Sequence, residues 1–229
     1  MRQLSLDAAR KPAGHGGWRP GAGRPKKQGA VSHQTRRAFA SRFPQHVTLR
    51  LGADSPPIAR DWLMKRVVRP CIALSAKPFF RVVEFNVLSN HVHLICEADD
   101  ALALARGVQG LAIRLARRMN TALKRKGKLF GPRYHAVALR TPAQVRNTLR
   151  YVLLNRKHHA PTARRFYAGW IDPYSSGVWF GGWQAPVRMN VGFNRVLAVD
   201  EAPTRSPRTW LLRAGWRRAG PISYDDRPA

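Results

Sequence analysis

The chain has 229 residues, enough for one domain of ordinary size with tails or for two small domains. Its 41 Lys and Arg against 12 Asp and Glu give a formal net charge of +29, which excludes a neutral surface. A charge of this size favours a polyanionic partner, with nucleic acid first and an anionic membrane surface second. Hydrophobic residues make up 44% of the sequence, so the chain can bury a core and is not simply a disordered basic tail.

Residues 1–44 are predicted to form an irregular basic arm. They hold ten Lys and Arg against one Asp, and Gly and Pro interrupt any regular element. The segment 23–27, Gly-Arg-Pro-Lys-Lys, resembles the core of an AT-hook, in which a flat Arg-Pro segment lies in the minor groove. Arg24 is therefore a candidate DNA contact, although short patterns of this kind also arise by chance in basic tails.

Residues 45–160 are predicted to form the ordered domain. Alternating or helical hydrophobic spacing, together with Pro, Gly, Asp and Thr at the element ends, defines seven elements. In chain order these are a strand over 46–51, a helix over 58–74, strands over 79–88 and 91–98, a helix over 100–126, a strand over 136–140 and a helix over 141–158. Ser89-Asn90 is short enough to join its two flanking strands as an antiparallel hairpin.

The first six elements have the order β-α-β-β-α-β. This order predicts an α+β fold of the ferredoxin-like split type, with an antiparallel sheet and helices packed on one face. After about residue 160 the chain becomes rich in Trp, Gly, Pro and Arg. We interpret residues 161–229 as a tail that packs on the domain or stacks on DNA bases, with a short amphipathic helix over 207–217.

The cysteine spacing and the hydropathy pattern do not indicate a zinc-binding, secreted or membrane protein. Cys71 and Cys96 lie far apart in apolar surroundings and lack a zinc-site spacing, which is typical of buried thiols in a reducing compartment. No apolar run has the length of a membrane span, and the N-terminus lacks a secretory apolar region. We therefore expect no membrane partner and a location in the cytoplasm.

The run His91-Val92-His93 is the first candidate site. Because side chains alternate along a strand, both imidazoles should face one side while Val92 faces the core. Two adjacent imidazoles suit metal binding, although two polar residues on a solvated face would give the same pattern. Glu97 shares this strand face and is a lesser candidate as a ligand or as a partner of a ligand.

The last helix of the domain carries the second candidate pair. Tyr151 and Asn155 are four residues apart, so they should lie one above the other on the helix. A tyrosine can act as a covalent nucleophile, and an amide oxygen suits a hard cation. Packing against the core is the alternative role for Tyr151.

The combination of His91-Val92-His93 on a strand with Tyr151 and Asn155 on a later helix resembles the single-tyrosine HUH transposases of the IS200-like type. Within these it is most similar to the REP-associated tyrosine transposases. The segments 86–90 and 130–135 and the run 172–176, Asp-Pro-Tyr-Ser-Ser, also resemble family sequence. The chain departs from the family where Asn155 is followed by Arg156, Lys157, His158 and His159 instead of Pro-Val-Arg, and the two histidines could compete as ligands.

The resemblance implies a DNA transposase. A divalent metal, Mg²⁺ or Mn²⁺, would be held by His91, His93 and Asn155. Tyr151 would attack a phosphate of single-stranded or hairpin DNA to give a 5′-phosphotyrosine, which a 3′-OH could resolve by strand transfer. The basic residues that we expect to contact the DNA backbone are Arg114, Arg117, Arg118, Arg140 and Arg150. Tyr134, Tyr167, Tyr174 and Tyr224 are rival nucleophiles that lack the helical Asn partner.

The sequence does not decide the oligomeric state of the protein or whether it is catalytically active. Relatives include monomers and dimers, so a homodimer is one of two expected states. The implied location is the bacterial cytosol or nucleoid. The alternative function is a catalytically inactive, domesticated DNA- or RNA-binding protein that uses the same fold and its sheet as a platform.

Overall fold

The computed structural model describes residues 38–159, 166–188 and 201–227. Arg24 and the AT-hook-like segment lie outside the described residues. None of the described helices combines the length and the apolar character needed to span a membrane.

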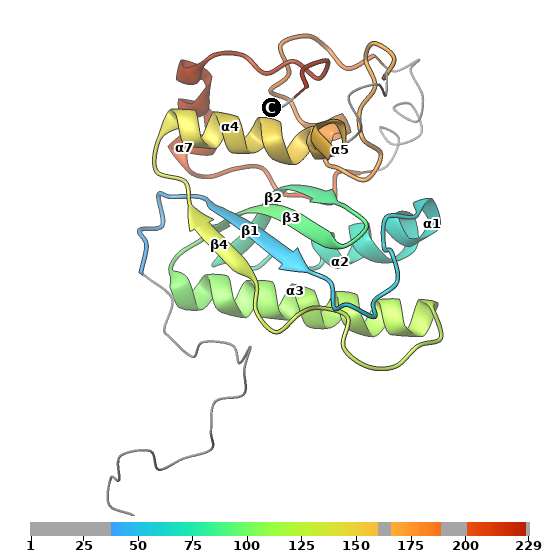
Figure 1. The fold of residues 1–229 in the computed structure, drawn as a ribbon. Coiled ribbons are helices and arrows are strands. Elements are labelled where there is room, and N and C mark those ends of the chain that lie inside the picture. The colour runs from blue at the N-terminus through green and yellow to red at the C-terminus, as the bar shows by residue number, and fades with distance from the viewer. Residues whose placement is uncertain (1–37, 160–165, 189–200, 228–229) are drawn as a thin grey trace, which may run out of the picture. The chain divides into compact units, whose positions relative to one another are not determined.

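A four-stranded antiparallel sheet forms the centre of the fold (Figure 1). The strands are β1 (Gln45–Arg50), β2 (Phe80–Val87), β3 (His91–Ala98) and β4 (His135–Ala138), in the order β2-β3-β1-β4. The predicted hairpin joins β2 and β3, and its turn is closed by the bond from Leu88 N to His91 O at 2.9 Å. The predicted α+β ferredoxin-like class is thereby confirmed.

The first helical segment differs from the prediction for 58–74. It consists of α1 (Asp61–Leu63), a π-helical turn η2 (Met64–Val68) and α2 (Arg69–Ala73). Pro70 lies inside this segment, and a proline removes a backbone donor and crowds the preceding turn, which explains the wide π turn ahead of it. Helical structure begins only after Arg60, three residues later than predicted, and the Arg60 side chain makes no cap bond.

The second helix of the core, α3 (Ala101–Ala122), packs on the same face of the sheet as α1 and α2. The Asp100 side chain caps it by accepting a hydrogen bond from Ala103 N at 2.7 Å. The helix ends four residues before the predicted position, and Lys124 follows with a φ of 49°. Both core helices therefore cover one face of the sheet, as the split arrangement predicted.

Helix α4 (Pro142–Leu153) covers the opposite face (Figure 1). It begins as predicted, because the Thr141 hydroxyl accepts a hydrogen bond from Gln144 N at 3.2 Å and Pro142 occupies the first turn. The predicted continuous helix to 158 is interrupted at Leu154, whose ψ of 16° is not helical. A separate short helix, α5 (Asn155–His159), follows the break.

The described part of the C-terminal segment packs on the α4 face. It contains the 3₁₀ turn η3 (Gly177–Trp179), helix α7 (Trp210–Arg213) and the 3₁₀ turn η4 (Gly215–Ala219), so the helix predicted over 207–217 is divided in two. Trp216 and Tyr224 are buried, and Arg205 N donates to Val82 O of β2 at 2.9 Å.

The two faces of β3 contribute to different cores. Val92, Leu94 and Cys96 belong to the cluster on the α3 side, whereas Ile95 belongs to the cluster with α4 and Trp216. Because side chains alternate, His91 and His93 share the face of Ile95 and point toward α4.

Candidate active site

The two histidines of β3 meet as the alternation predicted. His91 Nε2 lies 2.9 Å from His93 Nε2, and the ring centroids are 4.5 Å apart. His91 is half-buried and His93 is buried, while Val92 between them lies in the core on the other face. The strand therefore brings the Nε2 atoms of His91 and His93 together on one face of the sheet.

A third histidine, His46 of β1, completes the cluster. Thr48 lies directly opposite His93 across the strand pair. The Nδ1 atom of His93 is 3.1 Å from His46 Nε2 and 3.2 Å from Thr48 Oγ1. No local sequence pattern indicates this role, because His46 is 47 residues from His93 along the chain and only the strand register brings the two close.

Burial keeps these imidazoles neutral. It lowers the pKa of His93 to about 3, with the neighbouring His46, His91 and His159 lowering it further. Burial, followed by the influence of His135, lowers the pKa of His46 to about 4. The pKa of His91 is also lowered, first by burial and then by His159 and Arg50. Near neutral pH these rings are unprotonated, so one nitrogen of each ring carries a free lone pair.

Tyr151 reaches this cluster from α4. Its ring centroid is 5.3 Å from that of His93 and 6.2 Å from that of His46. A cavity of about 840 Å³ is bordered by His46, His91, His93, Tyr151 and His159. None of the rival tyrosines borders it. Tyr174 instead donates to Asp61 at 2.8 Å, and Tyr224 donates to Pro186 O at 3.1 Å.

Asn155 follows the helix break and is 0% exposed. Both polar atoms of its amide are buried and have no hydrogen-bond partner among the residues that the structure describes. Asn155 is not among the residues that border the histidine cavity, whereas His159 is, with its ring centroid 6.4 Å from that of His91. Among the described residues, no three His, Cys, Asp or Glu side chains are placed to hold a metal ion.

The expectation that Glu97 assists the histidines is wrong. Its buried carboxylate accepts hydrogen bonds from Arg208 N at 2.8 Å and Thr209 N at 2.8 Å, and it lies 3.9 Å from the Arg81 guanidinium. Glu97 therefore binds the backbone at the start of α7 and holds the C-terminal segment against the sheet.

The candidate DNA-binding arginines do not converge on the site. Arg114, Arg117 and Arg118 lie on α3, across the sheet from the histidines. Arg140 is exposed beside the Phe43 ring, at 5.6 Å. The Arg150 guanidinium lies 3.3 Å from Asp226 and donates to Arg227 O at 3.1 Å. The sequence reasoning missed Arg50, which is exposed, pairs with His91 across the sheet and borders the cavity.

Comparison with known proteins finds a similar fold and a family model that matches part of the chain. The solved structure of a REP-associated tyrosine transposase bound to a REP hairpin is similar to this chain, with a TM-score of 0.51 and 17% identity over 78% of this chain and 100% of that one. The fold is thus that of a tyrosine transposase. Residues 55–154 match the family model described as "Transposase IS200 like".

The family match covers both β3 histidines and Tyr151, and it ends one residue before Asn155. No curated protein sequence gives a significant match to the chain. The resemblance predicted from the histidines and Tyr151 is confirmed, because residues 55–154 match this family model and the fold is similar to that of the solved transposase.

Proposed function

We propose that this protein is a metal-dependent nuclease and strand transferase that cleaves single-stranded or hairpin DNA through Tyr151. The observation that carries the proposal is the approach of the Tyr151 ring to within 5.3 Å of the His93 ring, at a cavity that His91 also borders. A phenol beside converging imidazole nitrogens provides a nucleophile and metal ligands at one place.

The residues present fit a divalent metal such as Mg²⁺ or Mn²⁺. His91 and His93 would supply Nε2 atoms, and Asn155 would supply its amide oxygen. A buried amide without hydrogen bonds is costly, and a ligand role would offset that cost. His159 borders the same cavity and is the competing third ligand. When bound, the metal would polarise the scissile phosphate and stabilise charge in the transition state.

His46 and Thr48 support this ligand set. Both contact Nδ1 of His93, so a proton on Nδ1 can be shared with one of them while Nε2 keeps its lone pair for the metal. The two contacts restrain the orientation of the His93 ring.

The chemical step assigned to the chain is a transesterification. The Tyr151 oxygen attacks the phosphorus and the bond from phosphorus to the 3′ oxygen breaks. The phenol loses its proton and the leaving 3′ oxygen gains one, so the products are a 5′-phosphotyrosine and a free 3′-OH. Because one phosphodiester replaces another, the 3′-OH of a second strand can reverse the step, which is strand transfer.

DNA is the proposed partner on two grounds. The chain carries a formal net charge of +29, which suits the phosphate backbone. The similar solved transposase is itself bound to a REP hairpin. Arg50 at the edge of the cavity is placed to contact a phosphate of the entering strand.

The test is a covalent-adduct assay. The full chain is incubated with labelled hairpin DNA and Mn²⁺ and separated on a denaturing gel. The wild type should give a labelled protein band, and Tyr151→Phe should give none. Tyr167→Phe, which changes an exposed tyrosine away from the cavity, is the matched control and should keep the band. An adduct that persists in Tyr151→Phe would overturn the assignment.

The alternative, an inactive nucleic-acid-binding protein on the same fold, predicts a different result. Such a protein would bind the hairpin in a native gel and give no covalent band with any divalent metal.

A further inference from the structure

A buried carboxylate, Asp172, lies outside the histidine cavity and has no part in the proposed chemistry. It is 1% exposed and belongs to the segment 172–176, which packs against β2. We propose that Asp172 is a positioning residue for the metal ligand Asn155, which it holds near His93 by binding both α5 and β2. This inference rests on the proposed ligand role of Asn155, and it does not require Tyr151 to be the nucleophile.

The Asp172 carboxylate contacts residues of two elements. Its Oδ2 atom accepts a hydrogen bond from Asn86 Nδ2 of β2 at 3.1 Å. Its Oδ1 atom lies 3.7 Å from the Arg156 guanidinium of α5 and accepts a hydrogen bond from Tyr174 N at 3.0 Å. One side chain therefore connects the first turn of α5 to a strand of the sheet.

The β2 end of this connection lies beside a proposed metal ligand. Asn86 is opposite His93 in the register of β2 and β3, and cross-strand partners place their side chains on the same face of a sheet. Asn86 is 0% exposed, so this contact is enclosed in the protein. Asp172 is thus attached to the sheet at the strand position of His93.

The segment that carries Asp172 is itself bonded to β2. Val87 N donates to Tyr174 O at 2.9 Å. The Ser175 hydroxyl donates to Asp172 O at 2.9 Å and closes the turn that begins at Asp172. A carboxylate on a segment held in this way has little freedom to move, so it can fix the position of a partner.

Helix α5 needs contacts outside itself to keep its direction. It has five residues and follows the break at Leu154, and a helix this short has little stability of its own in water. The Asn155 amide makes no hydrogen bond within the described residues that would orient it. Arg156, the next residue, contacts Asp172 and lies over the Tyr174 ring at 4.8 Å. The contacts of Arg156 therefore help to set the direction of Asn155.

Two anchors hold α5, and they attach it to different parts of the molecule. Lys157 Nζ donates to Tyr224 O at 2.5 Å, which attaches the helix to the C-terminal segment. Asp172 attaches the helix to the sheet, on the face where α4 and α5 lie (Figure 1). Because His93 belongs to the sheet, loss of the Asp172 anchor should move Asn155 relative to His93 while the Lys157 anchor remains.

The test measures Mn²⁺ binding to the full chain by titration calorimetry without DNA. Asp172→Asn keeps the size of the side chain and an oxygen for Asn86, but it removes the charge that attracts Arg156. It should weaken Mn²⁺ binding about tenfold, as the loss of a group that orients a ligand commonly does. Asp226→Asn is the matched control, because it removes the charge of an ion pair with Arg150 of α4, and it should leave the affinity unchanged. Wild-type affinity in Asp172→Asn would overturn the proposal.

Paired variants separate positioning from a general loss of structure. Arg156→Gln should weaken binding as Asp172→Asn does, and the double variant should be no weaker than either, because the two residues act through one contact. Arg156→Lys keeps the charge and should recover most of the affinity. In an Asn155→Ala background, Asp172→Asn should have no further effect. An added loss in that background would show that Asp172 does not act through Asn155, which would also overturn the proposal.

Asn155→Ala alone distinguishes failure of the positioning role from failure of the ligand assignment. If Asn155→Ala weakens Mn²⁺ binding by about tenfold or more while Asp172→Asn does not, the ligand assignment stands and the positioning role is wrong. If Asn155→Ala binds Mn²⁺ as tightly as the wild type, Asn155 is not a ligand and both assignments are wrong. The role of Tyr151 is tested separately by the covalent adduct.

Discussion

At the scale of single residues, His46 is expected to act through its contact with His93. Its Nε2 atom lies 3.1 Å from His93 Nδ1, on the side of the ring away from His91. Removing a hydrogen-bond partner of a metal-ligating histidine commonly weakens metal binding by 10- to 100-fold. We therefore expect His46→Ala to weaken Mn²⁺ binding at least about tenfold, measured by titration calorimetry without DNA.

His135→Ala is the matched control for this prediction. His135 is exposed on β4, pairs with Thr48 across the strands and does not border the cavity. Its loss should leave the Mn²⁺ affinity unchanged. If His46→Ala binds Mn²⁺ as tightly as the wild type while His93→Ala does not bind, His46 has no part in positioning the ligand.

Glu84 makes a separate prediction about pH. Burial raises its pKa in the folded chain to about 8 from an ordinary value of 4.5. The unfolded chain ionises first as pH rises, so the stability contributed by Glu84 is fully present below pH 4.5 and is lost between there and about pH 8. Glu84→Gln does not titrate, and its stability relative to wild type should rise over this window by up to about 1.4 kcal/mol per pH unit. Urea unfolding at both ends of the window would measure this change, and parallel pH profiles would contradict it.

The sequence predicted those site residues that depend on local periodicity. Alternation on one strand was enough to place His91 and His93 on one face, and helical spacing placed Tyr151 on the helix that covers it. The position of His46 beside His93 depends on the strand register. The contacts of Glu97 depend on a backbone segment more than 100 residues away. No local pattern reports contacts of that kind.

At the scale of elements, the contact between α3 and β2 depends on a glycine. A Cβ at Gly107 would lie 2.1 Å from the Phe80 ring, whereas a Cβ at Gly110, one turn later on the same helix, would meet nothing within 4 Å. Gly107→Ala should therefore destabilise the fold by about 1–3 kcal/mol through overpacking. Gly110→Ala should stabilise it by up to about 1 kcal/mol through helix propensity. Chemical denaturation of both variants checks the pair, and equal shifts in the same direction would contradict the packing argument.

The order and type of the elements were predictable, but their interruptions were not. The Thr141-Pro142 start of α4 is a local signal and was predicted correctly. No Gly or Pro near Leu154 predicts the break in the helix. The Leu154 side chain is buried, and the short helix beyond it buries Asn155 and Lys157. Tertiary burial of these residues determines where the helix ends.

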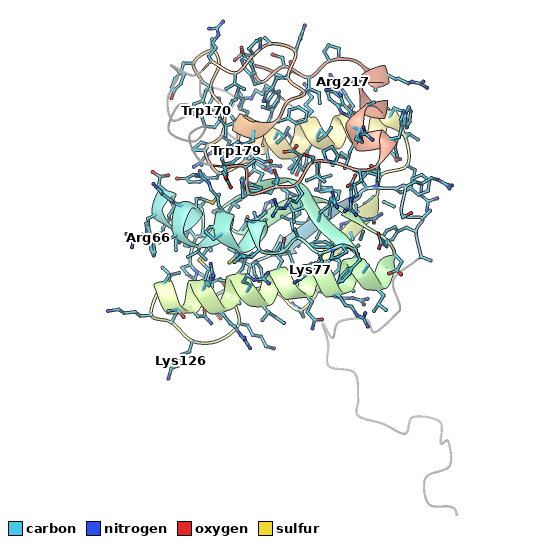
Figure 2. All side chains as sticks on the ribbon, turned by 180° about the vertical axis from the view of Figure 1, so that it is seen from behind. Arg66, Lys77, Lys126, Trp170, Trp179 and Arg217 are labelled. Atoms are coloured by element: carbon cyan, nitrogen blue, oxygen red, sulfur yellow. The ribbon has the colours of Figure 1, made fainter. Side chains whose placement is uncertain are left out.

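At the scale of the whole molecule, the positive charge is spread over both faces of the sheet. Lys126, beyond the end of α3, lies on the opposite side of the molecule from Trp179 and Arg217 (Figure 2). Arg50 borders the histidine cavity, whereas Arg117 lies on α3 across the sheet. We expect Arg50→Gln to lower the rate of adduct formation more than Arg117→Gln does.

The two variants can be compared in single-turnover reactions at low and high salt. Each phosphate contact that is lost should also reduce the slope of log affinity against log salt by about one. Equal rates for Arg50→Gln and Arg117→Gln at saturating DNA would show that the strand enters from another side of the cavity.

The C-terminal segment has a practical consequence for handling this protein. Arg146 of α4 donates to Pro221 O at 2.7 Å, Arg150 of α4 lies 3.3 Å from Asp226, and Lys157 of α5 donates to Tyr224 O at 2.5 Å. These bonds attach residues 221–226 to α4, which carries Tyr151, and to α5. A truncation or fusion that displaces residues 221–226 would therefore remove contacts of the helix that carries the nucleophile. Purification handles and labels are better placed elsewhere if adduct yields are to be compared between preparations.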